Sequence, residues 1–330
     1  MSRVEFDRHQ TKGTLLDDDW GRIFAKNKFL IGISIDGPEE LHDAYRLDKG
    51  GQPTFARVMR GLEMLKKHGV PFNALTVLNR KNSYLAHEVY RFLEQIGRNY
   101  LQFIPIVEQV AEGPDPNRLV LLKPYALRKT IVSDWSVEPL QFGRFLRQVF
   151  DVWVAQDVGR VFVQVFDVAL ESWYGVEQSL CVFKPDCGQA LVVEHNGDVY
   201  SCDHFVYPEN RLGNIMNRAL GSLVDSTQQR KFGAAKSSTL PSDCRQCDVR
   251  FACNGECPKH RFTTTETGEY RLNYLCAGYK HLFRHIDPYM RFMENELNHN
   301  RAPARVLEWE RSRRGAIGSA AVSQQAVAGY

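Results

Sequence analysis

The residues of this sequence with the clearest chemical potential are eight cysteines, which all lie between residues 181 and 276 of the 330-residue chain. They are Cys181, Cys187, Cys202, Cys244, Cys247, Cys253, Cys257 and Cys276. The spacing is Cys-x9-Gly-x4-Cys from Cys187 to Cys202, and Cys-x2-Cys-x5-Cys-x3-Cys from Cys244 to Cys257. Because thiolates are strong ligands of soft metals, this clustering predicts a segment built around thiolate chemistry.

Three kinds of site compete for these thiols. Four disulfides fit the count, but disulfide frameworks are typical of small secreted chains, and this long chain shows no apolar leader. Structural zinc is a second option, although only Cys244 and Cys247 form the short pair that zinc ribbons repeat. Two iron–sulfur clusters would use all eight thiolates, four each, and this interpretation is favoured. Reduced thiols in turn favour a cytoplasmic location.

Composition excludes several classes of function. The net charge of +3 is nearly balanced, so we expect neither nucleic acid nor an anionic membrane surface as a partner. No apolar run approaches the roughly 20 residues that span a bilayer. The length allows two domains with cores of their own.

The first part of the sequence alternates strand and helix patterns, which predicts an α/β fold with a parallel sheet. The predicted strands are 29–35, 72–78, 100–107 and 161–166, and the predicted helices are 54–68, 84–96 and 142–156. Gly69 and Gly97 follow two of these helices as stop signals. Residues 110–138 contain three prolines and suggest a loop with one short strand.

Turn and helix signals organise the cysteine-rich part. Asn196-Gly197 lies between two apolar runs and predicts a hairpin, which places Cys202 just after its second strand. Residues 244–257 are polar and suggest a loop. A helix is expected over 279–297 with a break or kink at Pro288. The arginine-rich sequence beyond Arg301 suggests a flexible basic tail.

The cysteine pattern resembles the SPASM domain, an auxiliary-cluster module that follows radical S-adenosylmethionine (SAM) barrels. The chain is most similar to the anaerobic sulfatase-maturating enzymes, from about Gln10 to His285. Supporting segments are Gln-Thr-Lys-Gly-Thr-Leu-Leu-Asp from Gln10, Phe-Leu-Ile-Gly-Ile-Ser-Ile-Asp-Gly-Pro from Phe29, His42-Asp43 with Arg46, Phe-Asn-Ala-Leu-Thr-Val from Phe72, and Gln-Phe-Ile-Pro from Gln102.

The resemblance implies a domain plan and a ligand set. Residues 1–170 would form the later half of a partial (β/α)6 radical SAM barrel, 171–290 a SPASM domain, and 291–330 the end of a helix and a flexible tail. Two 4Fe–4S clusters are implied. One would be held by Cys181, Cys187, Cys202 and Cys257, and the other by Cys244, Cys247, Cys253 and Cys276. With every iron ligated, electron transfer is the expected role.

The family also needs a Cys-x3-Cys-x2-Cys segment for a third 4Fe–4S cluster that binds SAM, and no cysteine precedes Cys181 here. We expect a truncated or mis-started chain that does not cleave SAM by itself, and a cysteine-free pseudoenzyme is the alternative. An in-frame upstream Cys-x3-Cys-x2-Cys would support the first, and a stop codon close to Met1 the second.

The implied activity is that of an oxidoreductase that converts Cys or Ser in an unfolded sulfatase segment, Cys/Ser-x-Pro/Ala-x-Arg, to Cα-formylglycine. Asp203 matches the family's catalytic aspartate, and Ser34, Arg46 and Val107 match SAM contacts. Each of these residues also has a structural interpretation. Asp203 would orient a thiolate, Ser34 would be a turn residue, Arg46 a surface residue and Val107 a core residue. His204 is left unassigned. A flavodoxin or ferredoxin is the expected electron donor.

Two other functions remain open. A different SPASM enzyme could form thioether or carbon–carbon links in a small peptide, although Asp203 and the Gln10–Leu16 segment favour sulfatase maturation. A non-catalytic module that carries clusters or binds peptides is the other alternative, and it rests on the missing Cys-x3-Cys-x2-Cys segment.

Overall fold

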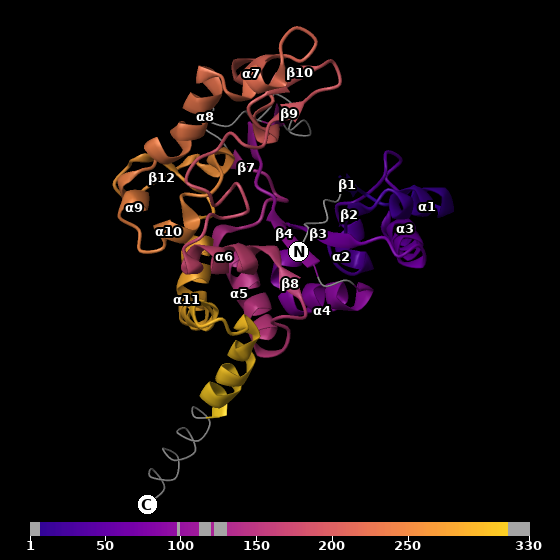
Figure 1. Ribbon diagram of the computed structural model, residues 1–330, viewed down its shortest axis with the longest axis vertical. Helices are drawn as coiled ribbons and strands as arrows, with labels where there is room; N and C mark the ends of the chain where they lie inside the picture. The colour runs from indigo at the N-terminus through magenta and orange to yellow at the C-terminus, as the bar shows by residue number, and fades with distance from the viewer. Residues whose placement is uncertain (1–6, 98–99, 112–119, 122–130, 316–330) are drawn as a thin grey trace, which may run out of the picture. The chain divides into compact units, whose positions relative to one another are not determined.

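The computed structural model describes residues 7–97, 100–111, 120–121 and 131–315 (Figure 1). These residues form two compact units, which are described separately. The first unit comprises Met1–Ile106, Arg144–Leu170 and His285–Tyr330, and the second comprises Val107–Gly143 and Glu171–Arg284. The division expected from the sequence, after residues 170 and 290, stays a prediction.

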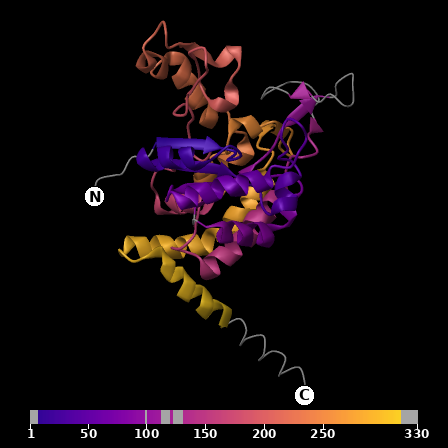
Figure 2. The ribbon, with the colours of Figure 1, turned by 90° about the vertical axis from the view of Figure 1, so that its right-hand side faces the viewer.

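A five-stranded parallel sheet is the framework of the first unit. Its strands are β1 (Asp7–Thr11), β2 (Phe29–Ser34), β3 (Phe72–Leu78), β4 (Tyr100–Pro105) and β8 (Phe162–Val163). They are ordered β1-β2-β3-β4-β8, and each neighbouring pair is parallel. Figure 2 shows the indigo strands β1 and β2 side by side. The expected α/β class with a parallel sheet is therefore confirmed.

Helices connect successive strands of this sheet, as right-handed crossovers between parallel strands require. They are α1 (Asp18–Lys26), α2 (Glu39–Asp43), α3 (Phe55–Lys67), α4 (Ala86–Ile96) and α5 (Pro139–Gln156). The predictions for α3, α4 and α5 are confirmed. In α3 the residues Val58, Leu62 and Leu65 recur at helical spacing and are at most 1% exposed.

The last predicted strand of this part is only partly correct. Residues 161–166 are rich in valine and phenylalanine, but β8 ends at Val163 and helix α6 (Gln164–Tyr174) begins at once. Phe166, Val168 and Ala169 are all buried. A short apolar run has no clear period, so burial of this helix outweighs its strand propensity.

The C-terminal helices differ from the expectation in two ways. Helix α11 (Cys276–Asn298) continues through Pro288 without a break, and Ile286 and Met290 beside it are fully buried; the alternative of a kink stays a prediction. Residues 306–315 are helical, where a flexible tail was expected, and appear as the second yellow helix in Figure 2. Val306 anchors this helix with no exposed surface. Residues 316–330 of the expected tail lie outside the described residues.

In the second unit, the predicted hairpin is confirmed. Strands β9 (Val192–Val193) and β10 (Asp198–Tyr200) pair antiparallel, and β11 (Arg211–Asn214) adds a third strand. Gly197 has a φ of +83°, which a turn of this kind requires. Helices α7 (Leu220–Val224) and α8 (Thr227–Ser238) follow, and Leu223 of α7 packs in the hairpin's small core.

The remaining elements of this unit are short. Strands β5 (Gln109–Ala111), β6 (Val120–Leu121) and β7 (Ile131–Val132) form one sheet, where a single strand was expected. The loop expected over 110–138 lies partly outside the described residues, at 112–119 and 122–130. Two short helices, α9 (Ser242–Arg245) and α10 (Arg250–Cys253), replace the expected loop around the cysteines. Strands β12 (Thr263–Thr264) and β13 (Tyr270–Leu272) form a small antiparallel ladder.

Across the described ranges, no helix combines the length and the apolar character that crossing a membrane would take.

Helix α3 approaches the chain after β1 so closely that one position accepts only glycine. A Cβ atom on Gly61 would lie 2.1 Å from the backbone oxygen of Gly13. We expect Gly61→Ala to lower the free energy of unfolding by about 1–3 kcal/mol. Gly221→Ala is the matched control, since nothing lies within 4 Å of its Cβ position in helix α7. Urea unfolding followed by circular dichroism measures both, and equal stability of the two variants would contradict the contact.

Candidate metal centre

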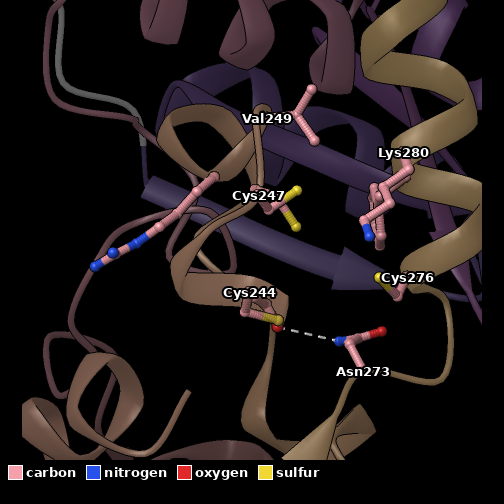
Figure 3. A pocket seen from close by; sticks show the side chains of 10 residues that line it. Cys244, Cys247, Val249, Asn273, Cys276 and Lys280 are labelled. Carbon is pink, nitrogen blue, oxygen red and sulfur yellow. Dashed lines mark hydrogen bonds between the residues drawn. The ribbon is translucent and has the colours of Figure 1, made fainter. Parts of the chain in front are cut away.

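Four of the eight cysteines line one pocket of the second unit (Figure 3). They are Cys244, Cys247, Cys253 and Cys276. Cys244 lies in α9, Cys253 ends α10 and Cys276 begins α11, while Cys247 lies between α9 and α10, so three short-range segments bring these thiols together. Val249, Arg250, Gly255, Asn273, Tyr279 and Lys280 complete the lining. These are the four thiols that the family resemblance assigned to one cluster.

The other four cysteines influence one another electrostatically in the same unit. Burial is the main reason that the pKa values of Cys187 and Cys202 are raised, and negative charge at Cys181 and at Cys187, respectively, adds to it. Both Cys187 and Cys202 raise the pKa of Cys257. Such effects act at short range, so these side chains are neighbours although 76 residues separate the first from the last. They are the four thiols that the family resemblance assigned to the other cluster.

The thiols of both groups are suited to a metal. All eight are free cysteines. Burial raises the pKa of Cys244 to about 11 and that of Cys202 to about 12, and it raises the pKa of Cys257 far above its usual value. Buried thiolates packed this closely repel one another, and cationic metal removes that penalty by deprotonating and binding them. The donor sets therefore fit an iron–sulfur cluster.

Backbone N–H groups are directed at several of these sulfur atoms. The N–H groups of His204, Gly255 and Lys259 lower the pKa of Cys202, Cys253 and Cys257, respectively, although burial has the larger, opposite effect on each. Hydrogen bonds to ligand sulfurs stabilise the thiolate and are a recognised control of cluster potentials.

The loop between Cys253 and Cys257 has an unusual backbone. Asn254, Gly255 and Glu256 have φ values of +47°, +72° and +50°, a left-handed run that is strained at the two non-glycine positions. A Cβ on Gly255 would lie 2.4 Å from Leu240 Cδ2 and 2.8 Å from Arg261 Nη2, so only glycine fits there.

One fully buried arginine holds this strained loop. Arg261 is 1% exposed. Its Nε donates to the oxygen of Gly255 at 2.9 Å, and its Nη2 donates to those of Asn254 and Glu256 at 2.8 and 2.9 Å. Charge-assisted bonds to three successive carbonyl groups offset the strain and fix the directions of both flanking cysteines.

A second buried network supports the same loop through the carboxylate of Glu256. Glu256 Oε2 accepts hydrogen bonds from Asn273 Nδ2 at 2.7 Å and from His260 Nδ1 at 3.0 Å. Burial opposes its ionisation, but these partners outweigh burial and lower the pKa of Glu256. Asn273 also donates to the oxygen of Gly255 at 3.3 Å (Figure 3). Arg261 thus holds the carbonyl groups of the loop, and His260 and Asn273 hold its carboxylate.

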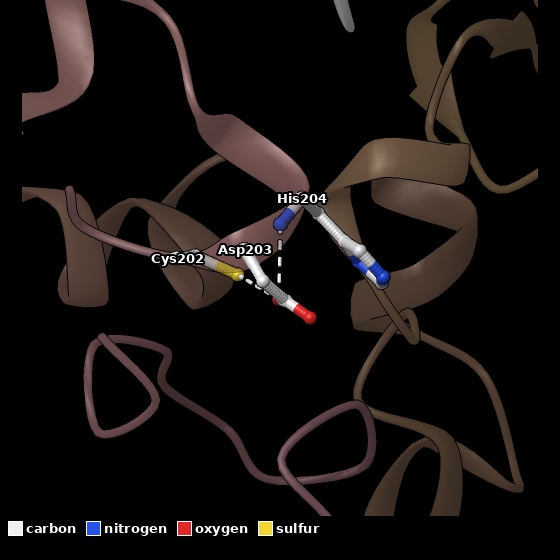
Figure 4. A group of neighbouring side chains, drawn as sticks. All are labelled: Cys202, Asp203 and His204. Carbon is white, nitrogen blue, oxygen red and sulfur yellow. Dashed lines mark hydrogen bonds between the residues drawn. The ribbon is translucent and has the colours of Figure 1, made fainter. Parts of the chain in front are cut away.

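Asp203 and His204 each contact a predicted ligand thiol, and Figure 4 shows Asp203 beside Cys202. Asp203 Oδ1 accepts from Cys202 Sγ at 3.2 Å and from the backbone N–H of His204 at 2.9 Å. His204 Nδ1 lies 3.4 Å from Cys257 Sγ. Asp203 is solvent-exposed, and its second carboxylate oxygen points away from Cys202 in Figure 4. This arrangement leaves one oxygen directed away from the thiol.

Two of the three residues predicted to contact SAM lie in the first unit. Ser34 ends β2 and is 8% exposed, at the carboxyl edge where parallel sheets bind ligands. Arg46 donates to both oxygens of the buried Asp36, at 2.6 and 2.9 Å, so it is not the free surface arginine of the alternative. Val107 lies in the second unit and is 2% exposed, which the core alternative also explains. Their role with SAM stays a prediction.

A buried histidine fixes the turn that carries Asp36 and Arg46. Burial lowers the pKa of His42, which favours a neutral ring. The N–H of Asp36 donates to Nδ1 at 3.4 Å, and Nε2 then donates to Thr54 Oγ1 at 3.1 Å. The Thr54 hydroxyl in turn donates to the oxygen of Arg46 at 2.6 Å. Asp36 is therefore an ion-pair partner as well as a turn residue.

Sequence reasoning missed the buried polar residues around the cysteines. They are Gln229, Lys236, Glu256, His260, Arg261 and Asn273. Each lies in a polar stretch, where exposure is the default expectation. The Asn254-Gly255 pair between two cysteines was the one local signal that could have indicated a tight turn there.

Comparisons with known proteins agree with this geometry. Residues 181–248 match the SPASM family model, described as an iron–sulfur cluster-binding domain. The serine-type anaerobic sulfatase-maturating enzyme of Bacteroides thetaiotaomicron is 48% identical over 299 residues, which are 91% of this chain and 72% of that protein. The chain belongs to the anaerobic sulfatase-maturating enzyme family.

More distant relatives extend the comparison to structure. The cysteine-type anaerobic sulfatase-maturating enzyme of Clostridium perfringens is 31% identical over 84% of this chain and 71% of its own length. The structure of native anSMEcpe with bound AdoMet and Cp18Cys peptide superimposes with a TM-score of 0.76 at 31% identity, covering 88% of this chain and 76% of that one. The expected radical SAM/SPASM family is confirmed.

The strained loop yields a stability prediction. We expect Arg261→Met to lower the free energy of unfolding by more than about 3 kcal/mol, because it removes charge-assisted hydrogen bonds to four carbonyl groups in and beside the loop. We also expect it to retain less iron than the wild type. Arg218→Met is the control, since Arg218 is exposed. Thermal unfolding and iron analysis after anaerobic purification measure the effect, and wild-type values in Arg261→Met would refute the role of this residue.

Proposed function

We propose that this chain provides the later barrel strands and the cluster domain of a radical SAM oxidoreductase that matures sulfatases. The reaction is the oxidation of a serine or cysteine in an unfolded sulfatase segment to Cα-formylglycine. The observation that carries the proposal is the 48% identity to a serine-type sulfatase-maturating enzyme across 91% of the chain. On that similarity, we propose serine as the preferred target.

The eight thiols are proposed to hold two 4Fe–4S clusters. Cys181, Cys187, Cys202 and Cys257 form one ligand set. Cys244, Cys247, Cys253 and Cys276 form the other. When bound, the clusters supply a low-potential acceptor for the electron that peptide oxidation releases. Four thiolates per cluster leave no open iron, which favours electron transfer over substrate binding at metal.

Asp203 is the proposed general base. Oxidation of the peptide Cβ carbon releases a proton as well as an electron, and the proton needs an acceptor within hydrogen-bond reach. The Asp203 carboxylate is exposed, and one of its oxygens points away from Cys202 (Figure 4). The other oxygen is fixed by the N–H of His204, which limits rotation of the side chain. This geometry supports a base beside a ligand cysteine.

Ser34, Arg46 and Val107 are the proposed SAM contacts of this chain. The Asp36–Arg46 ion pair would fix the arginine beside the carboxyl edge of β2, where Ser34 lies. Cleavage of SAM needs three further thiolates, and residues 1–180 contain no cysteine. The complete activity is therefore proposed for a polypeptide that also carries a Cys-x3-Cys-x2-Cys segment.

The proposed partners follow from this chemistry. An unfolded Cys/Ser-x-Pro/Ala-x-Arg segment of a sulfatase is the substrate, and a flavodoxin or ferredoxin is the electron donor. The cytoplasm is the proposed location, since thiols and oxygen-sensitive clusters persist in a reducing compartment.

Metal content tests the cluster assignment directly. Anaerobic reconstitution with iron and sulfide is expected to give about eight irons per chain, four for each set of thiolates. Removing the metal with a chelator is expected to abolish the visible absorption and to lower the melting temperature, because metal binding is coupled to folding. Stoichiometric zinc without iron would falsify the assignment.

Peptide oxidation tests the activity. A polypeptide that joins this chain to a segment with the Cys-x3-Cys-x2-Cys motif is given SAM, a reductant and a short sulfatase peptide that contains serine or cysteine. Loss of two hydrogens from the serine peptide by mass spectrometry is the expected result. We expect Asp203→Asn to lower turnover by at least about 100-fold while iron content stays at the wild-type level.

The exposed Asp225→Asn is the matched control for this substitution and should turn over normally. Normal turnover in Asp203→Asn would remove the base assignment. Loss of iron in Asp203→Asn would instead favour the thiolate-orienting alternative.

A further inference from the structure

Helix α8 contains no cysteine, yet one of its faces contacts the segments that carry three of the four thiols of the Cys181 group. Gln229 Nε2 donates to the oxygen of Gly188 at 2.9 Å and to that of Ser201, next to Cys202, at 3.2 Å. Gly233 accepts from the N–H of Cys187 at 3.2 Å. Lys236 Nζ donates to the oxygens of Cys181 and Val182 at 2.9 and 2.8 Å. The spacing of these positions, four and then three residues, is that of one helix face.

The approach at Gly233 is close enough to exclude any side chain. A Cβ atom there would lie 2.5 Å from the oxygen of Cys187. The oxygen of Lys236 also accepts from Arg261 Nη1 at 2.5 Å, which ties α8 to the loop that precedes the fourth cysteine, Cys257. Every ligand segment of this site is therefore attached to α8 directly or through Arg261.

Lys236 is the unusual member of this face. It is 1% exposed, and among the described residues its ammonium group forms no ion pair with a carboxylate. Two other buried charged residues lie near its ammonium group, Glu256 and Arg261, and their charges have opposite signs. An isolated buried cation is costly unless a nearby negative charge compensates it.

The compensating charge is available at the thiol site itself. Lys236 Nζ donates to the oxygen of Cys181 itself, and Gly233, one turn earlier on the same helix face, accepts from the N–H of Cys187. Four thiolates carry more negative charge than an iron–sulfur core can neutralise, and each added electron increases the excess. A fixed cation close to the ligands is therefore expected to stabilise the reduced cluster.

We propose that Lys236 is the positioning and charge-compensating residue of the Cys181, Cys187, Cys202 and Cys257 site, where it holds the Cys181 segment and raises the cluster's reduction potential. The inference rests on the proposed function, because it requires a cluster at this site. It assigns this cluster as the better acceptor for the single electron that leaves the peptide radical.

The other thiol pocket has a different cation. Lys280 lines it together with Cys244 and Cys276 (Figure 3). Lys280 is partly exposed, so solvent screens its charge more than that of Lys236. Each thiol site therefore has its own lysine, and the effect of each lysine on the reduction potentials can be measured separately.

The test is a potentiometric titration of the reconstituted protein, followed by the electron paramagnetic resonance signals of its reduced clusters. We expect Lys236→Gln to make one cluster harder to reduce by about tenfold or more in its equilibrium, about 59 mV for one electron, and to leave the other unchanged. Lys280→Gln should move the other transition. Lys231→Met, at an exposed position of the same helix, should move neither.

Each outcome decides the inference. Unchanged potentials in Lys236→Gln with full iron content, or a shift of the same transition that Lys280→Gln moves, overturn it. If Lys236→Gln retains only one cluster, Lys236→Arg, which keeps the charge, must restore both clusters, and failure to do so also overturns it. A wild type that binds no iron counts against the proposed function instead.

Discussion

Repulsion among closely packed thiolates is the constraint on which the cysteine-rich unit depends. Burial alone keeps these groups protonated, as the raised pKa of Cys202 and Cys244 indicates. The unit meets the constraint with buried cations and directed N–H groups, and it leaves the remaining charge to be neutralised by metal. The surrounding fold can be understood as a frame that keeps these compensating groups in place.

Much of the fold could be predicted from local sequence. The periods of α3, α4 and β3 match their burial, and the Asn196-Gly197 turn fixes the hairpin. At 164–166, tertiary burial outweighs the strand preference of the residues, and a single sequence does not display its tertiary partners.

The candidate site likewise contains residues that the sequence could locate and residues that it could not. Cysteine spacing located the ligands, because a pattern of eight thiols is specific and its resemblance to a known module is strong. Lys236 and Arg261 could not be found in this manner. Both lie in polar stretches, and their roles depend on carbonyl groups that are distant in sequence, such as the oxygen of Cys181 for Lys236. Only the three-dimensional arrangement reveals that these cations are buried.

The left-handed loop of Asn254, Gly255 and Glu256 joins one thiol of each proposed ligand set. Cys253 at its start belongs to the Cys244 set, and Cys257 at its end belongs to the Cys181 set. Arg261 and Asn273 bind the carbonyl groups between them, so the backbone directions of both cysteines depend on the same hydrogen bonds. A disturbance of this short connection would therefore reach both donor sets at once.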